Sequence, residues 1–146
     1  MTFFLAVSIL FLDQLTKFII TKTLSLNQSI PIIKGVFHLT LIHNRGAAFG
    51  ILKNQIPLFI STSIVAIILI YFHLKSPQHR KFSIYSISLS LILAGGIGNF
   101  IDRAFFGYVI DFLDFRVWPV FNVADSAITV GAILLGWSIC FQKSVK

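Results

Sequence analysis

The sequence predicts an all-α integral membrane protein with four transmembrane helices, and three observations support this fold class. The chain of 146 residues is 56% hydrophobic and only 12% charged, with a mean hydropathy of +0.89, whereas a soluble domain is about a quarter charged. Four apolar stretches approach the roughly 20 helical residues that cross a bilayer. Most Lys and Arg residues lie near the ends of these stretches, as expected beside anionic lipid head groups.

The four apolar stretches differ in how charged residues interrupt them. They cover residues 2–20, 56–74, 82–101 and 120–141. The first contains Asp13 and Lys17, the fourth contains Asp125, and the other two are free of Asp, Lys and Arg. No Lys or Arg precedes the first stretch and no small-residue cleavage site follows it, so we expect a retained span rather than a secretory signal peptide.

The distribution of basic residues predicts the orientation in the membrane. The connection "KSPQHRK", residues 75–81, and the tail "QKSVK", residues 142–146, are short and basic. The positive-inside rule places both in the cytoplasm. With four spans the N-terminus is then cytoplasmic as well, and the connections 21–55 and 102–119 lie on the outer face.

The first outer connection contains a predicted strand. "GVFHLTLIHN", residues 35–44, is rich in β-branched and aromatic residues, and "NRGAAFG", residues 44–50, is typical of a turn. We expect a small β element on the outer membrane face. Neither an internal repeat nor a linker divides the sequence, so residues 1–146 are expected to form a single membrane domain.

The acidic residues gather at one membrane face of this topology. The chain has five, all aspartates: Asp13, Asp102, Asp111, Asp114 and Asp125. An Asp at the centre of a span costs about 2.5–3.5 kcal/mol on insertion scales and less near the interface. Polar residues at membrane depth usually face a bundle interior or a wet cavity, so each aspartate is a candidate for function.

Two groups of these residues also have a structural interpretation. Asp13 and Lys17 are four residues apart on a helix, the spacing of an ion pair. In "GGIGNFIDR", residues 95–103, the glycines allow close helix packing. Asn99, Asp102 and Arg103 share one helical face. An ion pair between Asp102 and a neighbouring Arg at the end of the span would explain these residues without any function.

The remaining aspartates allow two interpretations. In "FNVADS", Asn122 is placed to cap a helix with Asp125 at its third position, a capping box built from an Asp. Capping does not explain "VIDFLDF", where Asp111 and Asp114 stand among large apolar residues with only Arg116 as a local cation. If Asp111 and Asp125 lie close together, they cannot both ionise easily, and one holds a proton near neutral pH. This is the arrangement of an aspartic peptidase.

Other chemistries find less support. The chain offers no convincing Ser–His or Cys–His pairing, and its single cysteine excludes an internal disulfide. It lacks a paired-histidine motif and any Glu, so we predict no metal site and no cofactor. Because no basic cluster is interleaved with aromatic residues on a soluble module, we expect no nucleic-acid partner.

Five motifs together resemble the lipoprotein signal peptidases, the bacterial signal peptidase II family of membrane aspartyl peptidases. They are "DQLTK" at 13–17, "HNRGAAFG" at 43–50, "GGIGNFIDR" at 95–103, "VIDFLDF" at 109–115 and "FNVADSAITVG" at 121–131. They follow the family's order and spacing across nearly the whole chain. Any one would be a weak signal, whereas the set of five is specific.

The resemblance implies a fold and an activity. The fold would be four transmembrane helices with a small β cradle and a short helical segment on the outer face. The activity would be removal of the signal peptide of a prolipoprotein, on the amino side of a cysteine that carries diacylglycerol. The enzyme would lie in the bacterial cytoplasmic membrane in contact with membrane lipids, and we expect it to act as a monomer.

The resemblance also assigns roles to individual residues. Asp111 and Asp125 would be the catalytic pair, whereas Asp114 is not the catalytic position of the family's motif. Four residues would line the site and hold the substrate backbone and the two acids: Asn44, Asn99, Arg103 and Asn122. Three would be structural supports: Asp13, Lys17 and Asp102.

Two other functions are compatible with a small four-helix membrane protein. A transporter or proton-coupled carrier would use intramembrane Asp as a relay, but it predicts polar residues spread through the membrane depth rather than gathered at one face. A non-catalytic assembly protein would tolerate Asp-to-Asn changes at both 111 and 125.

Overall fold

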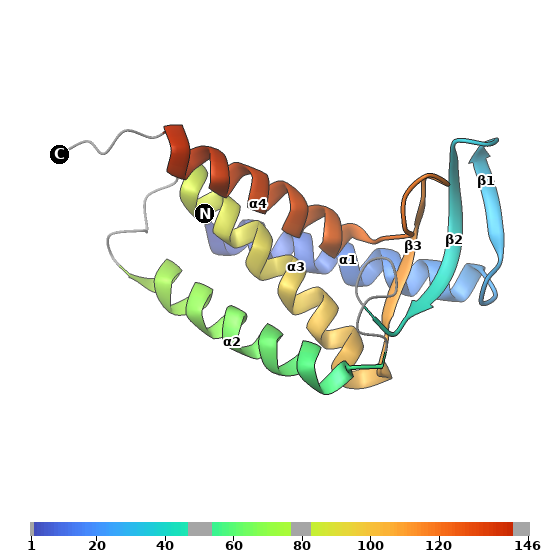
Figure 1. Cartoon of the computed structure of the whole chain (residues 1–146), viewed down its shortest axis with the longest axis horizontal. Helices are drawn as coiled ribbons and strands as arrows, with labels where there is room; N and C mark the ends of the chain where they lie inside the picture. Colours follow the sequence, from blue (N-terminus) through green and yellow to red (C-terminus); the bar gives the residue numbers. More distant parts are fainter. Residues whose placement is uncertain (1, 47–53, 77–82, 142–146) are drawn as a thin grey trace.

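The computed structural model describes residues 2–46, 54–76 and 83–141. Figure 1 shows its long helices lying side by side, with a small sheet at one end. The helices are α1 (Thr2–Thr23), α2 (Ile56–Lys75), α3 (Ile84–Phe106) and α4 (Val123–Phe141). The strands are β1 (Ser29–Ile33), β2 (Phe37–Asn44) and β3 (Val109–Asp114). All four helices are long and apolar enough to cross a membrane, which confirms the predicted fold class.

The third helix ends later than the sequence indicated. α3 continues to Phe106, and Gly107 follows it with a φ of 74°, the left-handed conformation that glycine adopts readily. The predicted stretch ended at residue 101 because Asp102 and Arg103 interrupt the apolar run. Asp102 therefore does not end the span but lies inside the helix, with a buried side chain.

α3 packs against the other three helices, and glycine brings two of them close to it. A Cβ on Gly95 would collide with the backbone oxygen of Ala124 on α4, and a Cβ on Gly98 would lie 2.5 Å from Asp13 Oδ2 on α1. These contacts confirm the expectation that small residues in "GGIGNFIDR" permit close helix packing. By contrast, α2 contributes no buried residue of its own.

The sheet is antiparallel, with the order β1-β2-β3. β2 confirms the predicted strand within residues 35–44. Asn44 lies opposite Val109 on β3, and His38 lies opposite Asp114. Sequence analysis did not identify β1 or β3 as strands. In β3, two aspartates interrupt the apolar run that would mark a strand.

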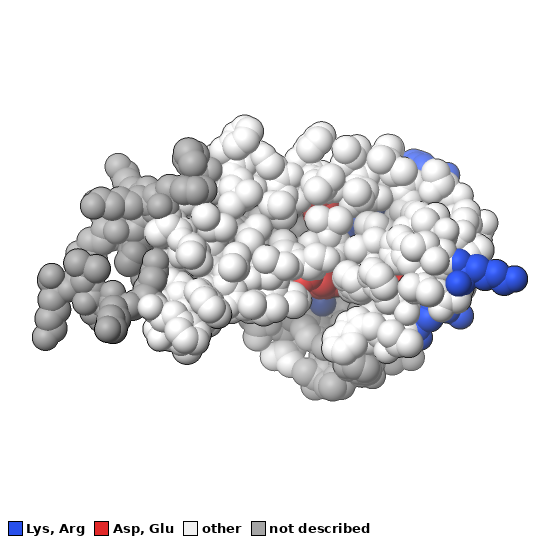
Figure 2. Space-filling model, turned by 90° about the horizontal axis from the view of Figure 1, so that it is seen from above, with Lys and Arg blue, Asp and Glu red and all other residues white. Residues whose placement is uncertain are grey.

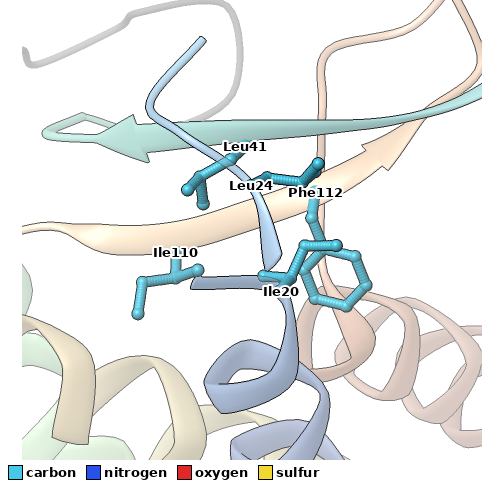
Figure 3. Close-up of a cluster of buried hydrophobic side chains, with 5 residues drawn as sticks. All are labelled: Ile20, Leu24, Leu41, Ile110 and Phe112. Carbon is cyan, nitrogen blue, oxygen red and sulfur yellow. The ribbon is translucent and has the colours of Figure 1, made fainter. Parts of the chain in front are cut away.

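A cluster of apolar side chains attaches the sheet to the end of α1 (Figure 3). Ile20 and Leu24 come from α1 and the turn after it, Leu41 from β2, and Ile110 and Phe112 from β3. Burial of such side chains contributes about 1.5–3 kcal/mol each. The cluster holds β3 against the end of α1, and this strand carries Asp111.

A loop leads from β3 back to the membrane. The backbone N–H groups of Phe112 and Leu113 both donate to the oxygen of Phe121, at 2.9 and 2.8 Å, just before α4 begins. Within the described residues, no short helix is assigned on this face. Part of the predicted turn "NRGAAFG", residues 47–50, lies outside the described residues.

Candidate active site

Asn122 connects Asp111 on β3 with Asp125 in the first turn of α4. Its side-chain Nδ2 donates to Asp111 Oδ1 at 2.7 Å, and its backbone N–H donates to Asp125 Oδ2 at 3.3 Å. Asn122 is fully buried and Asp111 is 1% exposed. The two aspartates that the sequence suggested as a pair therefore meet at one buried amide residue.

The same residue also caps α4. Asn122 Oδ1 accepts a hydrogen bond from the backbone N–H of Asp125 at 2.8 Å, while Asp125 Oδ2 accepts from the backbone N–H of Asn122. This reciprocal pair is the predicted capping box. The capping interpretation of "FNVADS" is confirmed, and the same cap brings Asp125 to the residue that also binds Asp111.

Two further amides complete the surroundings of the pair. Asn44, at the end of β2, donates from Nδ2 to Asp111 Oδ2 at 2.9 Å. Asn99 on α3 donates from Nδ2 to Asp125 Oδ1 at 2.7 Å. All four carboxyl oxygens of the pair thus accept an N–H from the protein, which stabilises negative charge in a site that burial makes unfavourable for it.

The proton affinity of Asp111 reflects this balance. Burial raises the pKa of the Asp111 carboxyl to about 7, and the nearby charge of Asp125 acts in the same direction. Hydrogen bonds from Asn44 and Asn122 and the charge of Lys17 lower the pKa and partly offset the rise. Asp111 is therefore suited to exchange a proton near neutral pH.

A buried ion triad lies next to the pair. Lys17 Nζ is 2.8 Å from Asp13 Oδ2 and 2.8 Å from Asp102 Oδ2. The predicted pair of Asp13 with Lys17 is confirmed. The predicted partner of Asp102 is wrong, since Asp102 pairs with Lys17 and not with Arg103. The true partner is on another helix, so spacing along α3 could not indicate it.

The triad also holds the two elements that carry the aspartate pair. Asp102 Oδ2 accepts from the backbone N–H of Ile110 on β3 at 3.0 Å. Asp13 Oδ1 accepts from the backbone N–H of Ala124 on α4 at 2.9 Å. Gln14, which sequence reasoning did not single out, donates to both Asp13 and Asp102, and its only signal was its place beside Asp13 in "DQLTK".

Arg103 lies at the edge of the site. Its Nη1 is 3.5 Å from the backbone oxygen of Asn99, and its guanidinium carbon lies 4.8 Å from the centre of the Phe59 ring. Its Nε is buried without a hydrogen-bond partner. Arg103 therefore retains an unused donor beside the aspartate pair.

A cavity of about 720 Å³ opens beside these residues. Asn44, Asn99, Arg103 and Asp125 form its polar part. The rest is mainly apolar and comes from α4 and the loop before it, including Phe115, Trp118, Val120, Phe121, Ile128 and Val130. Figure 2 shows acidic atoms only in small openings between uncharged atoms, whereas Lys and Arg project at the sheet end.

Comparisons with known proteins agree with this arrangement. A family model described as signal peptidase (SPase) II matches residues 5–141. The chain is 50% identical over 140 residues to a lipoprotein signal peptidase of Caldanaerobacter subterraneus subsp. tengcongensis, covering 94% of each protein. It is 47% identical to the lipoprotein signal peptidase of Halothermothrix orenii, covering 99% of each.

Solved structures show the same fold. The chain is similar to a bacterial membrane enzyme determined by the in meso method at 2.3 Å resolution, with a TM-score of 0.88 and 35% identity over 99% of this chain and 92% of that one. A second bacterial membrane enzyme, determined at 1.9 Å, gives a TM-score of 0.84 at 35% identity, covering 97% of this chain and 94% of that chain.

Proposed function

The chain belongs to the signal peptidase II family, and we propose that it is an aspartic endopeptidase acting on bacterial prolipoproteins. It removes the signal peptide by cutting on the amino side of a diacylglyceryl-modified cysteine. The observation that supports an aspartic mechanism is that Asp111 and Asp125 both accept hydrogen bonds from the same buried residue, Asn122.

The chemistry needs one carboxyl group with a proton and one without. The carboxylate takes a proton from a water molecule, whose oxygen attacks the carbonyl carbon of the scissile bond. The carboxylic acid gives its proton to the carbonyl oxygen. Collapse of the tetrahedral intermediate breaks the C–N bond and transfers a proton to the leaving amine. The proton belongs to the pair of Asp111 and Asp125 rather than to one residue.

The cavity supports binding of a lipid-modified peptide. Asn44 and Arg103 line the cavity and offer N–H donors for the carbonyl groups of a substrate backbone. The apolar wall of α4 and the preceding loop suits the acyl chains. A lipid anchor would hold the cysteine at a constant depth, so that the scissile bond meets the aspartates in a restricted geometry.

The proposed location is the cytoplasmic membrane, with both termini in the cytoplasm and the active site near the outer face. The sheet and the aspartate pair lie at the end of the bundle where α3 ends and α4 begins. α2 ends at the opposite end with Lys75, in the basic connection that the positive-inside rule places in the cytoplasm. We propose that the enzyme acts as a monomer among membrane lipids.

The test is cleavage of a purified, diacylglyceryl-modified prolipoprotein by the wild type and by Asp111→Asn and Asp125→Asn. Asp114→Asn is the matched control, because it makes the same chemical change on the same strand. Folding of each variant in detergent is checked by thermal denaturation. We expect a loss of at least about 10³-fold for the first two variants, since each removes one acid–base partner, and most of the activity to remain in the control.

Retained cleavage in folded Asp111→Asn and Asp125→Asn would contradict the aspartic mechanism and return Asp125 to the role of a helix cap. A wild type that cuts no lipid-modified prolipoprotein would contradict the substrate assignment. Mass spectrometry of the product, with cysteine expected at its new N-terminus, identifies the bond that is cut.

A further inference from the structure

Lys17 uses all of its hydrogen-bonding capacity inside the protein. The Lys17 side chain is 2% exposed, and its ammonium group donates to Asp13 Oδ2, Asp102 Oδ2 and, at 3.1 Å, Asn99 Oδ1. An ammonium group has three donors and no acceptor. Two carboxylates already neutralise its charge, so the third bond, to the neutral amide of Asn99, is not needed for charge balance.

This third bond determines which way the Asn99 amide faces. Because Lys17 can only donate, the amide oxygen must point toward Lys17. The amide nitrogen then points toward Asp125, where it donates at 2.7 Å. Asn122 Nδ2 donates to the same Asn99 oxygen at 3.1 Å and favours the same orientation. In the reverse orientation, two donors would face the amide nitrogen and an oxygen would face a carboxylate.

The other two amides of the site are oriented by local bonds. Asn122 Oδ1 accepts from the backbone N–H of Asp125 at 2.8 Å, and Asn44 Oδ1 accepts from the backbone N–H of Gly46 at 2.9 Å. Backbone N–H groups only donate, so both amide nitrogens face Asp111. Asn99 lies inside a helix, where the neighbouring backbone N–H groups are used by the helix itself. Its oxygen is held instead by two donors from other elements, the ammonium group of Lys17 on α1 and the amide of Asn122 before α4.

We propose that Lys17 is a positioning residue for the aspartate pair, which it serves by holding the Asn99 amide with its nitrogen toward Asp125. The inference rests on the proposed function and adds a role to a residue expected only to support the fold. Lys17 does not touch the substrate. It orients the amide of Asn99, and the nitrogen of this amide in turn holds the carboxyl group of Asp125. The charged groups that face the aspartate pair through or beside Asn99 are Lys17, Asp13, Asp102 and Arg103.

The experiment separates the hydrogen bond from the charge. Replacing Lys17 alone would leave two buried carboxylates unpaired, so Asp13→Asn and Asp102→Asn are combined with it. One triple variant carries Lys17→Met and the other carries Lys17→Gln. Both have a neutral triad, and the new asparagines still offer an oxygen to the N–H groups of Ala124 and Ile110. The variants differ in the donor presented to Asn99.

We expect the Lys17→Met triple variant to lose about 10²-fold in kcat with little change in KM, and the Lys17→Gln triple variant to recover at least about tenfold of this loss. The pH at which kcat falls on the alkaline side should be higher in the Met variant than in the Gln variant, because the charged form of the pair lacks one donor. A merely structural role would give equal kcat values and equal pH profiles in two equally folded variants.

Two results would overturn the inference: cleavage by the folded Met variant within about threefold of the wild type, or equal losses in both variants. If the Met variant does not fold, Asn99→Leu replaces it, since it is similar in size, offers no N–H to Asp125 and adds no charge beside that carboxyl group. Wild-type kcat in folded Asn99→Leu would also overturn the inference, and a loss of at least about tenfold would support it. Cleavage by the wild type, together with its loss in Asp111→Asn, tests the proposed function separately. If both are observed, the proposed function holds even when the inference about Lys17 fails.

Discussion

Asp111 and Asp114 lie three residues apart on β3 and are both buried, at 1% and 5% exposure, yet their surroundings differ. Among the residues that the structure describes, Asp111 accepts from the neutral amides of Asn44 and Asn122. Asp114 accepts from the hydroxyl of Thr40 at 2.7 Å and from both the backbone and the guanidinium of Arg116, at 2.8 and 3.0 Å.

The two carboxyl groups consequently differ in proton affinity. Burial raises the pKa of Asp111 to about 7. Burial also acts to raise the pKa of Asp114, but the hydrogen bonds from Thr40 and Arg116 and the charge of Arg116 outweigh it and lower the pKa. The comparison shows that burial does not by itself make a carboxylate reactive. The hydrogen bonds from Thr40 and Arg116, with the charge of Arg116, keep the pKa of Asp114 low. At Asp111, burial and the charge of Asp125 outweigh the hydrogen bonds of Asn44 and Asn122 and the charge of Lys17.

The largest difference between the two aspartates is expected when one neutral donor is removed from each in turn. Asn122→Ala removes the link between Asp111 and Asp125 and the cap of α4, so we expect cleavage to fall by about 10²–10³-fold and stability by about 1 kcal/mol. Thr40→Val removes a donor from Asp114 and should leave cleavage within about threefold. Initial rates and thermal denaturation of both variants measure these effects.

Similar losses of cleavage in Asn122→Ala and Thr40→Val would contradict the distinction between the two aspartates. Such a result would mean that the sheet as a whole, rather than the surroundings of Asp111, determines the activity.

A smaller effect is expected in the pH dependence of stability. The folded-state pKa of Asp111 lies above the unfolded value of about 3.9, so its contribution to stability is complete below about pH 4 and is lost as the pH rises through about 7. The free energy of unfolding of the wild type should therefore fall by about 1–3 kcal/mol between about pH 6 and 9. Chemical denaturation in mixed micelles measures this fall, which should disappear in Asp111→Asn.

Asp114→Asn should behave in the opposite way. Because the pKa of Asp114 is lowered in the folded state, its contribution is present above about pH 4 and is lost as the pH falls. We expect Asp114→Asn to be less stable than the wild type at pH 7 by about 1–3 kcal/mol and to keep the alkaline fall. An alkaline fall that survives in Asp111→Asn would assign the titration to another group.

The smallest effect concerns Asn44, whose amide favours the charged form of Asp111. In Asn44→Ala, the aspartate pair should hold its proton more tightly, and the alkaline limb of the cleavage rate should move up by up to about one pH unit. The pH profile of kcat measures the shift, and Thr40→Val is the control that should not move it. A shift to lower pH in Asn44→Ala would contradict the assignment.

The sequence predicted the parts of the molecule that depend on local pattern. Apolar run length located the four helices, helical spacing identified the pair of Asp13 with Lys17, and the cap of Asn122 with Asp125 followed from their separation of three residues. These features are recognisable because the interacting groups lie within one turn of each other.

Contacts between distant segments were not predictable in this way. The bond from Lys17 to Asp102 joins α1 to α3, and β3 was hidden because its aspartates break the apolar pattern that marks a strand. Spacing alone also did not distinguish Asp111 from Asp114. The resemblance to the family motif made that distinction as an expectation, and in the structure the two residues have different hydrogen-bond partners.

The most direct measurement is the infrared spectrum of the protein labelled with ¹³C at the aspartate carboxyl groups, recorded from about pH 5 to 9. The account predicts a protonated-carboxyl band that disappears with a midpoint near 7, that is lost or changes its midpoint in Asp111→Asn and that is unchanged in Asp114→Asn. No titrating carboxyl band in this range, or a band that persists in Asp111→Asn and is lost in Asp114→Asn, would contradict it.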